Sequence, residues 1–276
     1  MTTAQIEITR EIALKVRDTV DAGLSSGLGT RKAGQMCVEA AVCYALGLPH
    51  GDDPGCVSSP LRRLKIRLND AAWSSKAARA AGLRRLALAQ LGSAGVLDDR
   101  EFVRRVVDMT IRRSVPASLR AAAAVNPKHA VALEAAAVRC EQEGTRAACQ
   151  HARDVAREAR ADADAAADAA AAADAAAAAA AYAAAHAAAD ADAAATADAA
   201  ADAAAYAAAD AAADADAAAD AAAYAYAAAY ADAYAAAYAY AARDKSLAAY
   251  AEWVVEILID MQAPGCQWLD LVPKAA

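Results

Sequence analysis

The chain has 276 residues and a formal net charge of −7, and alanine supplies much of its 59% hydrophobic content. This length allows one or two domains, and no run of some 18 strongly apolar residues occurs, so a membrane-spanning helix of ordinary length is excluded. The first residues are charged and lack the apolar stretch of a signal peptide, so we expect a cytoplasmic protein with reduced cysteines.

Charge is distributed unevenly along the sequence. Residues 1–160 carry a net charge of +8, whereas residues 161–242 contain 13 Asp and no basic side chain. This asymmetry predicts a mildly basic globular part joined to an acidic segment. We therefore expect three parts: an all-helical basic domain over 1–143, an Ala/Asp/Tyr low-complexity helical segment over 144–243, and a C-terminal amphipathic helix and tail over 244–276.

Apolar residues in the first part recur at helical spacing, with Gly or Pro between the runs. The pattern predicts helices at about 4–22, 34–49, from Ser59-Pro60 onward, 75–91, 99–113 and 128–143. We expect Ser59 to cap the third of these helices and Pro116 to end the fifth. The β-branched residues are not spaced as in strands. The predicted fold class is all-α: a compact helical domain, then a long Ala-rich helical segment and a short C-terminal amphipathic helix.

Every residue other than alanine in 161–242 stands at an even-numbered position. A period of two is typical of strands, but Ala and Asp are poor strand residues, and alanine is the best helix former. One continuous helix over this block would be roughly 120 Å long. The period produces no heptad stripe, which argues against an ordinary coiled coil. A straight helix and a folded bundle both remain open.

The segment 245–265, KSLAAYAEWVVEILIDMQAPG, predicts an amphipathic helix that Pro264 and Gly265 stop. If the alanine block is straight, the apolar stripe of this helix needs a partner chain. If the block folds back, the stripe covers the N-terminal domain of its own chain. Tyrosines are good interface anchors. The candidate interaction residues are Tyr224, Tyr226, Tyr230, Tyr234, Tyr238, Tyr240, Trp253, Val254, Ile257, Leu258 and Met261.

Basic residues are concentrated in 61–120, which holds 14 Lys and Arg against 5 acids. Phosphate backbones bind to such patches, although solvated helix faces have the same composition. The candidate nucleic-acid residues are Arg62, Arg63, Lys65, Arg67, Arg84, Arg85, Arg104, Arg105, Arg112 and Arg113.

Cys37, Cys43, His50 and Cys56 are residue types that bind zinc, but their C-x5-C-x6-H-x5-C spacing lacks the usual close cysteine pairs. We predict no metal and no cofactor. The stretch GQMCVEAAVCYALG (34–47) resembles the nucleophile region of papain-like cysteine peptidases. That resemblance implies Cys37 as nucleophile, His50 or His129 as base and Gln35 as oxyanion donor. Those folds take the histidine from a β-sheet, which this sequence does not predict, so a buried core thiol is favoured at position 37.

The stretches GQMCVEAAVCYALGLPHGDDPGCV, LKIRLNDAAWSS and GLRRLALAQLGS together resemble an uncharacterised bacterial and phage protein family over about residues 27–115. The resemblance implies no activity. The sequence thus favours a non-enzymatic structural or interaction protein, with the Ala-rich segment as a spacer or self-association surface. A nucleic-acid-binding protein is the alternative, and a Cys/His hydrolase is the third hypothesis.

Overall fold

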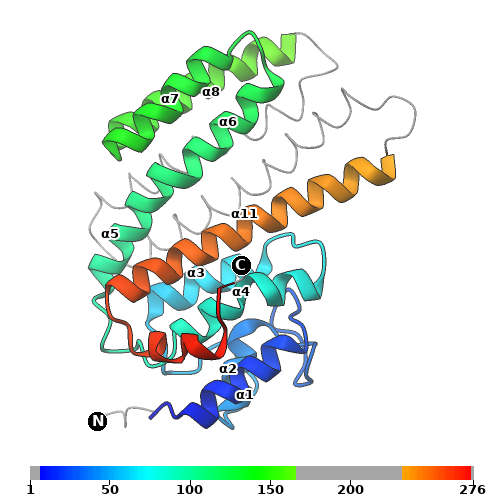
Figure 1. Cartoon of the computed structure of the whole chain (residues 1–276), viewed down its shortest axis with the longest axis vertical. Helices are drawn as coiled ribbons and strands as arrows, with labels where there is room; N and C mark the ends of the chain where they lie inside the picture. Colours follow the sequence, from blue (N-terminus) through cyan, green and yellow to red (C-terminus); the bar gives the residue numbers. More distant parts are fainter. Residues whose placement is uncertain (1–6, 166–231, 275–276) are drawn as a thin grey trace. The chain divides into compact units, whose positions relative to one another are not determined.

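The computed structural model describes residues 7–165 and 232–274 (Figure 1). Within these ranges the chain is helical and contains no β-strand, only an isolated antiparallel bridge between Gly29 and Met36. The prediction of an all-α fold is confirmed. In the same ranges no helix combines the length and the apolar character that crossing a membrane requires.

The chain divides into two compact units, one formed by residues 1–103 with 248–276 and the other by residues 104–247. This division does not follow the three parts expected from the sequence, because the C-terminal residues join the N-terminal ones in a single unit. Two helices, α5 (Asp99–Met109) and α11 (Asp232–Asp260), contribute residues to both units.

The first unit contains α1 (Arg10–Asp21), α2 (Val38–Ala45), α3 (Ser59–Asp70), α4 (Lys76–Ala89), the last turns of α11 and the 3₁₀ helix η2 (Pro264–Leu271). Side-chain oxygens cap the starts of α1 and α4. Thr9 Oγ1 accepts a hydrogen bond from the Ile12 amide, and Ser75 Oγ accepts one from the Ala78 amide. Such caps satisfy amides that have no partner inside the helix.

The predicted start of the second helix and the predicted cap of the third were wrong. The second helix begins at Val38 rather than at residue 34, because Gly34 has a φ of +76° and Met36 pairs with Gly29 instead. Cys37 is the N-cap of α2, and its Sγ accepts a hydrogen bond from the Ala40 amide at 3.3 Å. In α3 the N-cap is Ser58, not Ser59.

Helix α4 joins the N-terminal and C-terminal parts of the first unit. Gly82 allows close approach, since a Cβ there would overlap the Trp73 ring and lie 3.3 Å from the Ala248 Cβ on α11. Arg85 donates hydrogen bonds to Glu252 of α11 and to the Val272 carbonyl beyond η2. The apolar stripe of α11 is buried at Tyr250, Val254 and Leu258. The stripe is therefore part of the core of its own chain.

The second unit contains the end of α5, the π-helical turn η1 (Thr110–Ser114), α6 (Val115–Val125), α7 (Ala130–Glu143), α8 (Arg146–Ala165) and α11 up to residue 247. Helix α7 packs on both α6 and α8 (Figure 1). Arg112 donates hydrogen bonds to the carbonyls of Glu141, Gln142 and Glu143. These are the last carbonyls of α7, which lack partners inside the helix, so Arg112 acts as its C-terminal cap.

The prediction that Pro116 ends the fifth helix was wrong. The helical path continues through η1 into α6, and Pro116 lies in the first turn of α6. Proline has no amide hydrogen to donate, so a regular α-helix would leave one carbonyl unpaired. In the π-turn the Val115 amide donates to the Thr110 carbonyl, five residues back, and this extra residue accommodates the proline.

Most of the alanine block lies outside the described residues. Helix α8 ends at Ala165 and α11 begins at Asp232, so the hypothesis of one continuous helix over 161–242 falls largely on residues 166–231, outside the described ranges.

Gly265→Ala tests how the C-terminal tail packs on α4. A Cβ at position 265 would lie 2.3 Å from the Leu88 carbonyl oxygen and 2.6 Å from that of Ala89. Because backbone atoms cannot move aside cheaply, we expect the free energy of unfolding to fall by about 1–3 kcal/mol in urea titrations followed by circular dichroism. Gly51→Ala is the control: a Cβ there meets nothing within 4 Å, and we expect a change within about 0.5 kcal/mol. Equal effects of the two substitutions would contradict this packing.

Candidate functional site

The first unit contains a buried ion pair between α2 and α3. Lys65 Nζ lies 3.1 Å from Glu39 Oε1, and both side chains have no exposed surface. Moving two charges out of water costs several kcal/mol per ion unless they compensate one another. The pair therefore fixes how the first turn of α2 faces the middle of α3.

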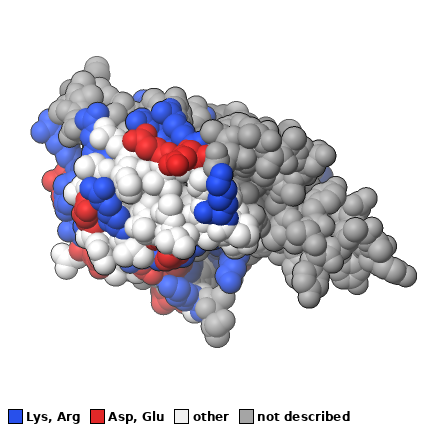
Figure 2. Space-filling model, turned by 90° about the horizontal axis from the view of Figure 1, so that it is seen from above, with Lys and Arg blue, Asp and Glu red and all other residues white. Residues whose placement is uncertain are grey.

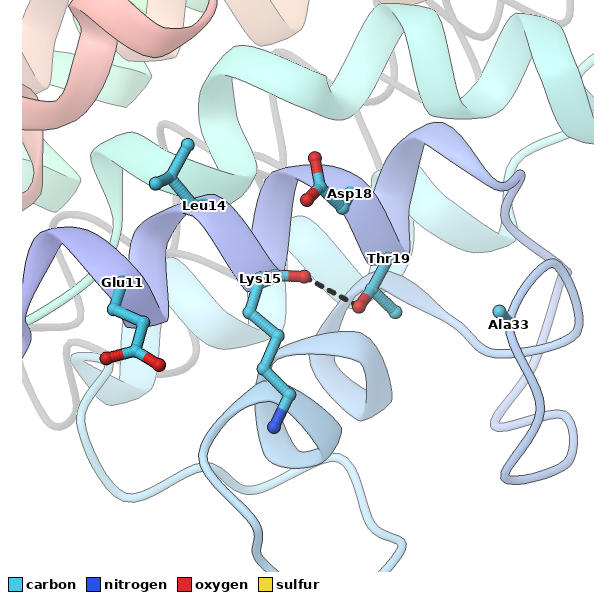
Figure 3. Close-up of a pocket in the computed structure, with 6 residues that line it drawn as sticks. All are labelled: Glu11, Leu14, Lys15, Asp18, Thr19 and Ala33. Carbon is cyan, nitrogen blue, oxygen red and sulfur yellow. Dashed lines mark hydrogen bonds between the residues drawn. The ribbon is translucent and has the colours of Figure 1, made fainter.

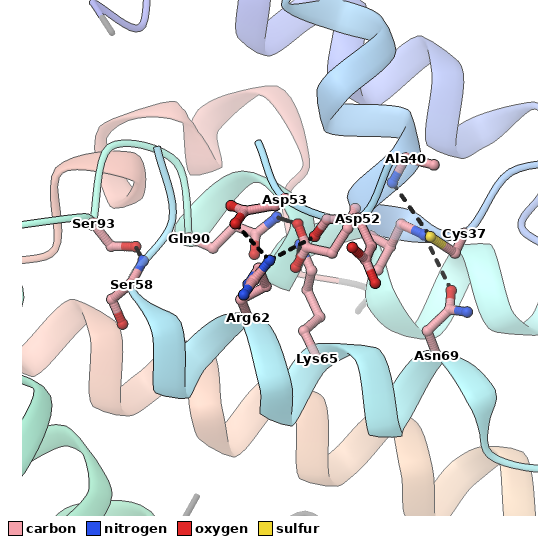
Figure 4. A network of polar contacts seen from close by, with 12 residues as sticks. Cys37, Ala40, Asp52, Asp53, Ser58, Arg62, Lys65, Asn69, Gln90 and Ser93 are labelled. Atoms are coloured by element: carbon pink, nitrogen blue, oxygen red, sulfur yellow. Dashed lines mark hydrogen bonds and ion pairs between the residues drawn. The ribbon is translucent and has the colours of Figure 1, made fainter. Parts of the chain in front are cut away.

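Further polar side chains surround this pair and form the buried polar network drawn in Figure 4. Gln90, at the end of α4, donates to Glu39 Oε2 at 3.4 Å. Asn69, at the end of α3, accepts from the Val38 amide and donates to the Ser25 carbonyl. On the outer side, Arg62 pairs with Asp53 at 2.9 Å. The network joins α2, α3, α4 and the loops before α2 and α3.

Burial shifts the ionisation of the groups in the network. It raises the pKa of Glu39 and lowers the pKa of Lys65, while the attraction between the two side chains opposes both shifts. Burial also raises the pKa of the Cys37 and Cys56 thiols, and it raises that of Cys43 to about 12. The three cysteines are therefore thiols at neutral pH, not thiolates.

A small cavity of about 60 Å³ borders the network, and Cys37, Asp52, Asn69 and Asp70 line part of it. Ligand pockets for metabolites usually measure roughly 300–1,000 Å³. This cavity has room for one or two water-sized groups only. The cavity is thus too small for a metabolite-sized ligand.

The residues proposed for a Cys/His hydrolase each have other contacts in the structure. Cys37 begins α2, but His50 Nε2 lies 3.1 Å from the Gly29 carbonyl, and Gln35 accepts a hydrogen bond from Thr30. His129 is the N-cap of α7 in the other unit. Across residues 7–165 and 232–274, no group of three or more His, Cys, Asp or Glu is placed to hold a metal ion.

The basic residues of 61–120 interact with other residues of the chain. Lys65 is fully buried against Glu39, so it does not contribute to a solvent-facing patch. Ion pairs join Arg62 to Asp53, Arg84 to Asp21, Arg85 to Glu252 and Arg112 to Asp108. The other candidates, Arg63, Arg67, Arg104, Arg105 and Arg113, also take part in polar or electrostatic interactions within the chain. Nucleic-acid binding stays a prediction.

Figure 2 shows how charge is distributed on one face of the molecule. Lys and Arg side chains stand there in separate groups beside Asp and Glu, with uncharged surface between them. A phosphate backbone is bound best by a continuous basic stripe. The face drawn does not present one.

The candidate interaction residues fall into three groups. Val254, Ile257 and Leu258 are buried within the chain, while Trp253 and Met261 are partly exposed. Tyr234, Tyr238 and Tyr240 belong to the first turns of α11. Tyr224, Tyr226 and Tyr230 lie outside the described residues. The apolar stripe of α11 is therefore not an open surface that awaits a partner chain.

A second, shallow pocket of about 410 Å³ runs along α1 (Figure 3). Glu11, Lys15, Asp18 and Thr19 line it, and the Thr19 hydroxyl donates to the Lys15 carbonyl at 2.6 Å. Lys15 Nζ lies 5.6 Å from the centre of the Tyr44 ring, in cation–π contact. The pocket is lined by both acidic and basic side chains along a single helix. It therefore favours neither anionic nor cationic ligands.

The buried ion pair was missed in the sequence, although a signal exists. Glu39 is the only charge in the α2 sequence VEAAVCYA, and Lys65 lies one helical turn after Leu61. A lone charge within an apolar helix, and a lysine on the apolar face of another, together indicate a buried pair. The prediction of Lys65 as part of a basic patch was wrong, because Lys65 lies on the same buried face of α3 as Leu61 and Leu68.

Lys65→Met should destabilise the protein in a pH-dependent way. The variant leaves Glu39 buried without its cation, which costs about 3–5 kcal/mol when the carboxylate is charged. The unfolded chain loses the Glu39 proton near the ordinary pKa of 4.5, whereas burial raises the pKa in the folded state. The free energy of unfolding of the variant therefore falls as pH rises above 4.5, and the deficit relative to wild type should be smaller at pH 5 than at pH 8.

Urea titrations of the wild type and the variant at both pH values measure this difference. The matched control is Lys65→Met combined with Glu39→Gln, because glutamine does not titrate. Between pH 5 and pH 8 its free energy of unfolding should fall less than that of the single variant. A deficit of the single variant that does not change with pH would contradict the assigned role of Glu39.

The Cys37 thiol should react slowly with iodoacetamide. The side chain is 5% exposed and burial raises its pKa, so at pH 7.5 we expect alkylation at least about tenfold slower than that of free cysteine. Mass spectrometry of tryptic peptides measures the rate, and the same reaction in denaturant is the control. Alkylation faster than that of free cysteine would instead support the hydrolase hypothesis.

Comparison with known proteins adds no family. No protein-family model matches the chain, and neither does any curated protein or solved structure. The resemblance of residues 27–115 to an uncharacterised bacterial and phage family stays a prediction.

Proposed function

We propose that the chain is a non-enzymatic interaction protein in which residues 166–231, the Ala/Asp/Tyr segment, form a self-association surface. One observation carries the proposal: the two helices that border this segment are both packed into the folded part of the chain. The segment is thus an insertion attached at both ends, and the buried C-terminal stripe is not available for association.

Helix α8 provides the first attachment. Ala148, Ala152 and Ala156 follow one another at four-residue spacing and are fully buried. Helix α8 packs against α7 and α6 along this face. Small side chains let helices approach closely, so the start of α8 is firmly held.

Helix α11 provides the second attachment. Its last turns are buried at Tyr250, Val254 and Leu258, and Glu252 is paired with Arg85 at 3.0 Å. Lys274, beyond η2, adds contacts to Glu252 and Glu256. These contacts hold the C-terminal part of the helix that follows the segment in the sequence.

The composition of the segment supports association rather than catalysis. Residues 166–231 contain 49 Ala, 10 Asp and 5 Tyr. Alanine permits close packing between chains, and tyrosine is a frequent interface anchor. The acidic charge keeps unpaired copies soluble. The proposal includes a cytoplasmic location, which the six free cysteines support.

Replacing the segment tests the proposal. In the variant, residues 166–231 are exchanged for a Gly/Ser sequence of the same length that keeps the ten Asp at their positions. Light scattering after size-exclusion chromatography should give a dimer or larger assembly for the wild type and a monomer for the variant, because the Ala and Tyr side chains are lost. Circular dichroism of the helices that remain checks that the folded part is intact.

Two results would contradict self-association: a wild-type monomer at every concentration, or a variant of the same oligomeric mass as the wild type. With a monomeric wild type, salt-sensitive retention of a DNA duplex in a gel-shift assay would favour the nucleic-acid alternative.

A further inference from the structure

Helices α7 and α8 form a hairpin, and Cys140 and Cys149 lie at the same distance from its turn. Gly144, with a φ of +61°, follows the end of α7, and Thr145 precedes α8. The Gly144 amide donates to the Cys140 carbonyl at 3.0 Å, and the Cys149 amide donates to the Thr145 carbonyl at 3.1 Å. Each cysteine therefore lies one helical turn from the reversal, on helices that pack together.

The two side chains meet in the interface between these helices. Both thiols are fully buried and share a hydrogen bond. Their neighbours in the interface are small, since Ala136, Ala137 and Ala148 are also fully buried. Small side chains keep the helix axes close, and a disulfide needs Cα atoms only about 4.4–6.8 Å apart.

We propose that Cys140 and Cys149 form a reversible disulfide that joins α7 to α8 when the cell's small-molecule disulfides, of the oxidised glutathione class, accumulate. This modification site goes beyond the self-association proposed above and does not depend on it. In the structure both residues are free thiols.

The reaction balances in two exchange steps. The Cys140 thiolate attacks one sulfur of the small disulfide, which forms a mixed disulfide and releases one small thiol. Cys149 then loses its proton and attacks the Cys140 sulfur, which releases the second small thiol. Two protein thiols are oxidised and one small disulfide is reduced to two thiols. The hydrogen bond from Cys149 lowers the pKa of Cys140, which favours Cys140 as the first nucleophile.

Burial controls the rate of this reaction. Neither thiol reaches solvent in the closed hairpin, so exchange requires local opening of α7 from α8. The other buried cysteines, Cys37, Cys43 and Cys56, belong to the first unit, and no disulfide or hydrogen bond between any two of them is found in the described part of the chain. We therefore expect selective pairing of Cys140 with Cys149.

Trypsin places the two cysteines on separate peptides, which makes the disulfide easy to identify. Cleavage after Arg139, Arg146 and Arg153 yields residues 140–146 and 147–153. The full-length protein is incubated with excess oxidised glutathione, alkylated, digested without reduction and analysed by mass spectrometry. We expect the two peptides to be recovered linked to one another and to separate after treatment with dithiothreitol.

In a second sample the two cysteines are accessible to the disulfide reagent from the start. Reduced, unfolded protein is refolded in a glutathione redox buffer and mapped in the same way. We expect the same linked peptides, and a thermal unfolding midpoint that rises by roughly 5 °C and returns on reduction, because the crosslink restricts the unfolded chain. Cys149→Ala should lose both effects, whereas Cys43→Ala, which changes a buried thiol of the other unit, should keep them.

Two outcomes would overturn the proposal. One is the absence of the linked peptides after refolding, with both cysteines alkylated or carrying glutathione. The other is a different pairing, such as a link among Cys37, Cys43 and Cys56, with Cys140 and Cys149 left as thiols. Neither outcome bears on the oligomeric mass, so this experiment and the test of self-association fail independently.

Discussion

The first unit depends on one pair of charges that have no water around them. Glu39 and Lys65 are fully buried, and each is tolerable in the interior only because the other lies 3.1 Å away. A shift of α2 along α3 that separated the two charges would leave each of them buried without compensation, which is costly. Gln90 and Asn69 extend the polar contacts to α4 and to the loop before α2. Polar contacts thus add to apolar packing in fixing the helix register.

Arginine side chains supply much of the remaining order by reaching backbone carbonyls. Arg79 donates to the carbonyls of Asn69 and Leu24, Arg85 to that of Val272, and Arg112 to the last carbonyls of α7. Each guanidinium offers several donors in a fixed plane, which suits a helix end or an irregular segment. These contacts hold two helix ends and two irregular segments, so they give part of the basic character of residues 61–120 an architectural explanation.

The sequence predicted the helices well and the relations between them poorly. Leucine spacing located α3 and α4, and Gly144 marked the end of α7, because these signals are local. The prediction of a helix end at Pro116 was wrong, because a π-turn, one residue longer than an α-turn, accommodates a proline that has no amide hydrogen. The role of Lys65 and the proximity of Cys140 to Cys149 depend on which helices meet, and residue types along one helix do not determine that. Burial of the α11 stripe was one of two open alternatives, and only its contacts decide between them.

The order of synthesis gives the discontinuous first unit a particular problem. Residues 1–103 leave the ribosome first, but the part of α11 that covers α4 and the tail that rests on Leu88 and Ala89 come only after residue 247. At about 5–20 residues per second, making the intervening 104–247 takes roughly 7–30 s. Throughout that interval α4 has α1 and α2 to pack on but lacks the cover that η2 and α11 provide later. The second unit is therefore synthesised in full before the first, and the packing of the nascent N-terminal helices is completed only when the C-terminal residues follow.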